Sequence, residues 1–166
     1  MNYFELFDIP ISFTPDKNKV QQQFYALSKK YHPDFYALHS DNEKAVALEQ
    51  SSYINTAYKT LMNDDAVIQY ILQLKGLLKE NEKYTLTSNF LMEMVELNEQ
   101  LADISKESAM DYVLIIKDMQ QALFAPIQHI IEHYKEGVTT EKELLQIKDY
   151  YYKKKYLTRI LEGVQK

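Results

Sequence analysis

The sequence predicts an all-α protein built from two small helical domains. Among its 166 residues, 46% are apolar, and only three glycines and four prolines are present to interrupt helices. Apolar side chains recur at helical spacing along most of the chain, and no stretch shows the alternation of a strand. A polar, charged segment separates two groups of these helices. We therefore predict an N-terminal helical domain at residues 1–75, a linker at 76–87 and a three-helix bundle at 88–166.

The N-terminal domain opens with two predicted helices. Residues 1–7 form a short helix or turn. Thr14 followed by Pro15 predicts the N-cap and the first position of the next helix. Pro33 disfavours helical geometry in the residue before it, so this helix should end at Tyr31 or His32. Its buried face, at helical spacing, consists of Val20, Phe24, Leu27 and Tyr31.

Two more helices complete this domain. Ser40 and Glu43 form a capping box, which predicts a helix that begins near Asp41. The pair Asn63-Asp64 indicates a stop and restart, and the fourth helix should end near Gly76.

Three longer helices follow the linker. The first covers residues 88–105, and the second covers residues 111–134 with a kink at Pro126, which lacks a backbone donor. Thr140 and Glu143 form a second capping box, which starts a helix that runs almost to the C-terminus. The apolar stripes of the three helices bury together as a bundle.

The composition excludes several classes of function. There is no cysteine, so the chain has no disulfide, no thiolate zinc site and no cysteine-held iron–sulfur cluster. The formal net charge of −5 argues against a general nucleic-acid binder. No apolar run is long enough to cross a bilayer, and the start does not resemble a secretory signal. We expect a soluble, cytoplasmic protein without a cofactor and without a nucleic-acid or membrane partner.

Charge is unevenly distributed, which indicates two partner surfaces. Residues 17–31 contain four lysines and no acid, and residues 93–103 contain four acids and no base. The run Lys29-Lys30-Tyr31-His32-Pro33-Asp34 ends the basic helix and enters the next loop. A short loop between two helices can present these ammonium, imidazole and carboxylate groups rigidly to another protein. It has no evident means of making or breaking a covalent bond, so we do not expect an enzyme.

The triplet His32-Pro33-Asp34 and its flanking helices resemble a J-domain, the module that docks on DnaK-type chaperones and stimulates their ATPase. Three further segments resemble the HscB co-chaperones of iron–sulfur cluster assembly, in the DnaJ superfamily. They are Met1-Asn2-Tyr3-Phe4-Glu5-Leu6-Phe7, Ile54-Asn55-Thr56-Ala57-Tyr58-Lys59-Thr60-Leu61 and Phe90-Leu91-Met92-Glu93-Met94-Val95-Glu96-Leu97. The resemblance covers nearly the whole chain. It implies a co-chaperone that delivers an IscU-like scaffold protein to a DnaK/HscA-type chaperone.

The resemblance assigns chaperone binding to the basic helix and its loop. The lysines would steer toward an acidic face of the chaperone, and Asp34 would accept a charge-assisted hydrogen bond there from a donor such as an arginine. The predicted chaperone-binding residues are Lys19, Lys29, Lys30, His32, Pro33 and Asp34. The alternative is a solvated basic face that ends at a helix-stopping proline. Two positions depart from the family pattern: Phe35 replaces a residue that is often basic, and Val67-Ile68-Gln69 replaces a segment that often carries arginine.

Client binding is assigned to the fifth predicted helix. If Phe90, Met94, Leu97 and Leu101 face the core, a turn of 100° per residue directs the intervening apolar side chains to the side and back. An apolar patch rimmed by acids is typical of a partner site. The resemblance to the HscB family implies that the residues that bind the scaffold client are Leu91, Met92, Val95, Glu96, Glu99, Asp103 and, on the last helix, Tyr156. The alternative is that Leu91 and Val95 pack on the J-domain or on a neighbouring helix.

Two other functions are alternatives. His129-Ile130-Ile131-Glu132-His133 matches the motif of inverted zinc peptidases and places both imidazoles on one side of a helix. No third ligand is evident nearby, so we predict a surface histidine pair, no metal and no catalytic residue. The second alternative is a J-domain co-chaperone for a different client. We expect the protein to be a monomer.

Overall fold

The computed structural model describes residues 1–165, and these contain helices and loops but no strand. The chain divides into two compact units. The first comprises Met1–Ile71 with Tyr134–Glu136, and the second comprises Leu72–His133 with Gly137–Lys166. The all-α prediction is confirmed.

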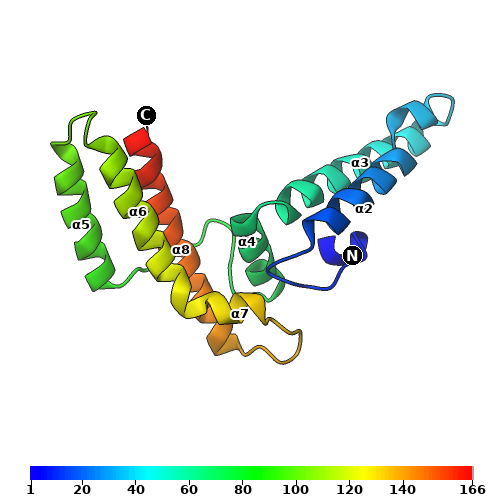
Figure 1. The fold of residues 1–166 in the computed structure, drawn as a ribbon. Coiled ribbons are helices and arrows are strands. Elements are labelled where there is room, and N and C mark those ends of the chain that lie inside the picture. The colour runs from blue at the N-terminus through cyan, green and yellow to red at the C-terminus, as the bar shows by residue number, and fades with distance from the viewer. Residues whose placement is uncertain (166) are drawn as a thin grey trace. The chain divides into compact units, whose positions relative to one another are not determined.

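The first unit is organised around a hairpin of two long helices. These are α2 (Lys17–Lys30) and α3 (Asp41–Leu61), which lie side by side, with the short η1 (Pro33–Tyr36) in the connection at their tip (Figure 1). Short α1 (Tyr3–Leu6) precedes the hairpin, and α4 (Asp64–Leu74) follows it. The hairpin therefore holds the connection at the end of two packed helices.

Aromatic pairs join the elements of this unit. The ring of Phe24 on α2 stacks on Tyr58 of α3, with centroids 4.0 Å apart. Tyr3 of α1 stacks on Tyr70 of α4 with centroids 4.2 Å apart, and the Tyr3 backbone N–H donates a 2.9 Å hydrogen bond to the Tyr70 hydroxyl. Such pairs stabilise a small core beyond the apolar area that they bury. The buried core of this unit includes Phe4, Val20, Ile54, Ala57 and Leu61, which are fully buried.

The N-cap of α2 differs from the prediction. Asp16, and not Thr14, caps the helix: its carboxylate accepts hydrogen bonds from the backbone N–H groups of Asn18 and Lys19, at 3.0 and 3.3 Å. A carboxylate also interacts favourably with the positive end of the helix dipole, which favours this later start. The Thr14 hydroxyl lies 3.3 Å from the hydroxyl of Ser12 instead.

The second unit contains the predicted bundle. Helices α5 (Ser88–Ala102), α6 (Ala109–Phe124) and α8 (Glu141–Gln165) run side by side (Figure 1). Thr140 caps α8, because its hydroxyl accepts a hydrogen bond from the Glu143 N–H, and the Glu143 carboxylate accepts one from the Thr140 N–H. The core shared by these helices consists of Phe90, Met94, Leu97, Ile116 and Leu157.

The predicted interruption at Pro126 is also present. The helix expected at residues 111–134 breaks into α6, the 3-10 turn η2 (Ala125–Ile127) and α7 (Gln128–Glu132). Proline fits the first turn of a new helical segment, where its missing N–H costs nothing. Gly137 then reverses the chain toward α8 with a φ of +79°, a backbone conformation that favours glycine.

The segment before α5 is bound along α8 within the second unit. The ring of Tyr84 stacks on Tyr152, with centroids 4.4 Å apart, and its hydroxyl donates a 2.8 Å hydrogen bond to Asp149. The Tyr152 hydroxyl donates a 2.8 Å hydrogen bond to Glu82, whose carboxylate also lies 3.1 Å from the Lys148 ammonium. We call these five side chains the Glu82–Tyr152 cluster. They fix the entry into α5 on the last helix.

Candidate partner-binding surfaces

The first candidate surface is the turn at the tip of the α2–α3 hairpin. His32 caps η1: its Nδ1 accepts a 3.2 Å hydrogen bond from the Asp34 backbone N–H, and its carbonyl oxygen accepts one from Phe35 N–H at 3.0 Å. In the neutral ring the proton therefore belongs on Nε2. The Asp34 side chain is 89% exposed, and one of its carboxylate oxygens lies 3.6 Å from His32 Nδ1. The turn thus presents an acceptor and an imidazole N–H to solvent on a rigid backbone.

The structure places two of the predicted lysines beside this turn and one away from it. Lys29 and Lys30 end α2 and are exposed, where the negative end of the helix dipole favours cations. Lys19 is exposed in the first turn of α2, roughly 15 Å from Lys29 along the helix at 1.5 Å per residue. The positive surface therefore extends along α2 and is not a single cluster.

Phe35 lies on the same turn, although the sequence did not predict it as a residue of the site. Its side chain is 59% exposed, and its ring meets His32 edge-on with centroids 6.2 Å apart. Leu38, three residues later, is fully exposed. In the sequence, the only indication that Phe35 belongs to this surface was its position as an unusual aromatic residue beside the charged triplet.

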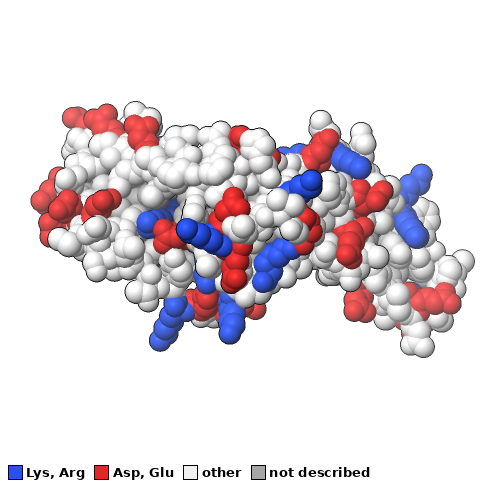
Figure 2. Space-filling model, turned by 90° about the horizontal axis from the view of Figure 1, so that it is seen from below, with Lys and Arg blue, Asp and Glu red and all other residues white. Residues whose placement is uncertain are grey.

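The second candidate surface is the outer face of α5. Leu91 is 39% exposed, Met92 64% and Val95 55%, so no other described helix covers them. Glu96, Glu99 and Asp103 are exposed on the same helix or at its end. Figure 2 shows acidic side chains gathered at the edge of the second unit where α5 lies. The face is therefore apolar at its middle and acidic at its border.

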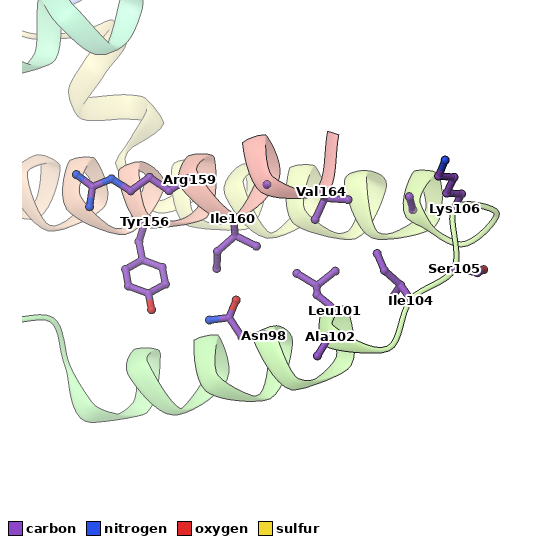
Figure 3. Close-up of a pocket in the computed structure, with 12 residues that line it drawn as sticks. Asn98, Leu101, Ala102, Ile104, Ser105, Lys106, Tyr156, Arg159, Ile160 and Val164 are labelled. Carbon is purple, nitrogen blue, oxygen red and sulfur yellow. The ribbon is translucent and has the colours of Figure 1, made fainter. Parts of the chain in front are cut away.

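Tyr156 occupies a different position from the other predicted client residues. It projects from α8 toward α5 and is partly buried, and its ring meets Phe90 edge-on with centroids 6.0 Å apart (Figure 3). It lines a groove of about 700 Å³ between the end of α5 and the end of α8. The sequence could not reveal this groove, because it depends on how closely two helices distant in the chain approach.

The two histidines of the peptidase-like motif do not form a metal site in the described part of the chain. His133 Nδ1 lies 2.9 Å from the backbone carbonyl of His129. Among residues 1–165, no group of three or more histidine, aspartate or glutamate side chains is arranged to hold a metal ion. In the same range, no helix is both long and apolar enough to span a bilayer.

A helical hairpin with an exposed His-Pro-Asp turn, joined in one chain to a three-helix bundle, defines the class of J-domain co-chaperones with a C-terminal helical domain. A family model described as the HSCB C-terminal oligomerisation domain matches residues 86–165. A co-chaperone protein HscB homologue from Vibrio cholerae serotype O1 (strain M66-2) is 33% identical over 172 residues, which cover 100% of this chain and 96% of the relative. A homologue from Colwellia psychrerythraea is 36% identical over 116 residues, which cover 69% of this chain and 66% of the relative.

Solved structures of HscB proteins are also similar to this chain. The chaperone HscB from Vibrio cholerae superposes with a TM-score of 0.78 at 30% identity, covering 99% of this chain and 96% of that one. The human co-chaperone protein HscB gives a TM-score of 0.84 at 29% identity, covering 99% of this chain and 81% of that one. The chain belongs to the HscB family of co-chaperones. The resemblance drawn from its motifs is therefore confirmed, and its fold is a J-domain followed by a C-terminal helical domain.

Proposed function

We propose that this protein delivers an IscU-like iron–sulfur scaffold to a DnaK/HscA-type chaperone in the cytoplasm and stimulates the ATPase of that chaperone. The observation that carries the proposal is the Asp34 carboxylate, which is 89% exposed on the turn of a helical hairpin in a co-chaperone family. Apart from its approach to His32 Nδ1 at 3.6 Å, this carboxylate is open to solvent, so it is well placed to accept a charged hydrogen bond from a partner.

Chaperone docking uses residues 1–75 in this proposal. Lys19, Lys29 and Lys30 speed the encounter with an acidic surface, and His32 and Asp34 make the close contacts. Pro33 fixes the backbone between those two residues. Docking stimulates hydrolysis if the surface binds the hydrolysis-competent state of the chaperone better than the other state.

Client binding uses residues 88–166, with 76–87 as the connection. Leu91, Met92 and Val95 supply apolar contact, and Glu96, Glu99 and Asp103 select a basic partner surface. Because a single monomer holds both partners, the scaffold gains a high effective concentration at the chaperone. No covalent chemistry and no resident cofactor are required of this chain.

Replacing Asp34 tests the docking role. Asp34→Asn keeps the size of the side chain but removes the charge, so stimulation of the chaperone ATPase should fall at least about tenfold, the effect of one charged hydrogen bond. The measurement is steady-state ATP hydrolysis by the chaperone with increasing co-chaperone. Asp118→Asn, an exposed acid on α6, is the matched control and should leave stimulation unchanged. Full stimulation by Asp34→Asn would refute the docking role.

Truncating the apolar patch tests the client surface. The double variant Leu91→Ala and Val95→Ala should weaken scaffold binding about tenfold, since apolar anchors at an interface centre carry much of the affinity. Titration calorimetry with the scaffold protein measures this change. Both side chains are exposed, so the melting temperature and the stimulation of the chaperone without client should not change. An unaltered scaffold affinity would show that the client surface lies elsewhere.

A further inference from the structure

A groove lies between α5 and α8 in the second unit, and apart from Tyr156 its lining residues have no role in the proposed function. It has a volume of about 700 Å³ and is lined by the end of α5, the loop that follows it and the last turns of α8. Figure 3 shows Leu101 and Asn98 of α5 directed toward Tyr156 and Ile160 of α8 across this space. Its walls combine aliphatic side chains with the ring of Tyr156 and with polar or charged side chains, which are Asn98, Ser105, Lys106 and Arg159.

The groove is an opening into the core of the bundle. Leu101, Tyr156, Ile160 and Val164 pack against the buried core cluster but are only partly buried themselves. If a partner removes the rest of this apolar surface from water, the burial contributes favourable free energy to binding. An apolar surface left open at the core is therefore expected to bind something apolar.

Gly163 leaves one position in the groove wall without a side chain. It lies in the last turns of α8 and lines the groove, and a Cβ atom added to it would meet no atom within 4 Å. Glycine is among the least favourable residues in a helix, so local helix stability does not account for it. A larger side chain here would project into empty space instead of into the protein.

Charge at the groove is complementary to a carboxylate. Arg159 lines the groove on α8, is exposed and makes no ion pair with any residue in the range that the structure describes. It is also the only arginine in the sequence. Arginine is the side chain best suited to a bidentate pair with a carboxylate at an interface. An occupant with an acidic group beside an apolar one would therefore suit this groove.

We propose that the groove receives an apolar segment of the scaffold client, and that a neighbouring carboxylate of the scaffold pairs with Arg159. This inference rests on the proposed function, because the same client covers the outer face of α5. Along α5, the groove residues Asn98 and Ala102 directly precede the exposed acids Glu99 and Asp103. A partner on the outer face thus reaches the groove without crossing any other element, and Tyr156 marks the point where the two surfaces join.

A pair of substitutions at one position tests the groove. Gly163→Leu should fill it and weaken scaffold binding about tenfold or more, as expected when the pocket of an apolar anchor is lost. Gly163→Ala adds only the Cβ atom and should bind as the wild type does. Titration calorimetry with the intact scaffold measures both, while circular dichroism and chaperone stimulation without client verify that each variant is folded.

Arginine replacement tests the charged contact separately. Arg159→Gln should weaken scaffold binding about fivefold and flatten its salt dependence, whereas Arg159→Lys should restore only part of the affinity because lysine lacks the planar fork. Unchanged binding by Arg159→Gln would overturn the carboxylate contact.

The outcomes distinguish this inference from the proposed function. If Gly163→Leu binds like Gly163→Ala while the Leu91 and Val95 double variant binds weakly, the groove is not part of the client site and the inference is wrong. If the wild-type protein does not bind the scaffold at all, the proposed function and the inference fall together. Loss of self-association in Gly163→Leu with unchanged scaffold affinity would show that a second copy of the chain occupies the groove, which also overturns the inference.

Discussion

Single side chains of the Glu82–Tyr152 cluster determine how α5 is attached to the bundle. Burial alone would raise the pKa of Glu82, but hydrogen bonds from Tyr152 and Lys148, together with the lysine charge, outweigh burial and lower it. Glu82 is therefore a paired carboxylate at neutral pH. Its Lys148 partner is only 13% exposed, so this ion pair is screened less than a surface pair would be.

Removing one hydroxyl from this cluster should destabilise the protein. Tyr152→Phe deletes the 2.8 Å hydrogen bond to Glu82 but retains the stacking on Tyr84. We expect the free energy of unfolding to fall by about 1 kcal/mol, the usual net value of one hydrogen bond. Urea denaturation followed by circular dichroism measures the change.

The matched control for that change is Tyr112→Phe. Tyr112 packs against the core of the bundle, and its hydroxyl makes no hydrogen bond with any residue from 1 to 165. Its free energy of unfolding should stay within ~0.5 kcal/mol of the wild type. Equal effects of the two substitutions would show that the Tyr152 hydroxyl adds nothing specific.

At the scale of the element, α8 has three structural roles along its length. Its first turn is capped by Thr140 and Glu143, and the stretch around Asp149 and Tyr152 holds the segment before α5. Its last turns, around Tyr156, form one wall of the groove. The spacing of these features explains why tyrosines cover so much of the helix: some stack on the linker while others face α5.

The attachment of the linker to α8 should weaken in alkaline solution. Burial, the hydrogen bond to Asp149 and the negative charge of Asp149 together raise the pKa of Tyr84 from 10.0 to about 12, and burial has the largest effect. Between these values the unfolded chain loses this proton while the folded chain keeps it, so the free energy of unfolding falls as the pH rises. Urea unfolding at about pH 9 and about pH 11 should show this fall, and Tyr84→Phe should make it shallower. A wild-type slope that Tyr84→Phe leaves unaltered would contradict the assignment.

For the whole molecule, the proposed function depends on two surfaces of opposite charge in one chain. Lysines without acids line α2, and acids without bases occupy residues 93–103. In the proposed function, each surface attracts a different partner and repels the wrong one. The formal net charge of −5 does not show that basic and acidic residues are separated in this way.

The chaperone interaction should therefore weaken with salt. The lysines of α2 act over a distance that ions screen, with a Debye length of about 8 Å at physiological ionic strength. Stimulation of the chaperone ATPase at a fixed, subsaturating co-chaperone concentration should decline as potassium chloride rises. The double variant Lys29→Gln and Lys30→Gln should stimulate the ATPase less, and its stimulation should decline less steeply with salt. If stimulation by the wild-type protein does not depend on the salt concentration, steering by the lysines is excluded.

The helices and their ends could largely be predicted from the sequence, because they follow from local rules. Ser40 and Thr140 cap helices as expected, and Pro126 divides its helix where its missing N–H requires. Thr14 was assigned wrongly because two nearby residues, Thr14 and Asp16, both satisfy the capping preference and only the path of the chain selects one. The exposure of the His32–Asp34 turn likewise follows from its position between two helices.

The sequence by itself determined the helical class, the membership of a co-chaperone family and the outward direction of Leu91, Met92 and Val95, since each depends on residues close together in the chain. Only the tertiary structure decided that Glu82 is tied to Tyr152, 70 residues away, and that α5 and α8 leave a groove beside Tyr156. Contacts of this kind depend on how closely packed helices approach one another. That distance is set by all the side chains between them and leaves no local pattern in the sequence.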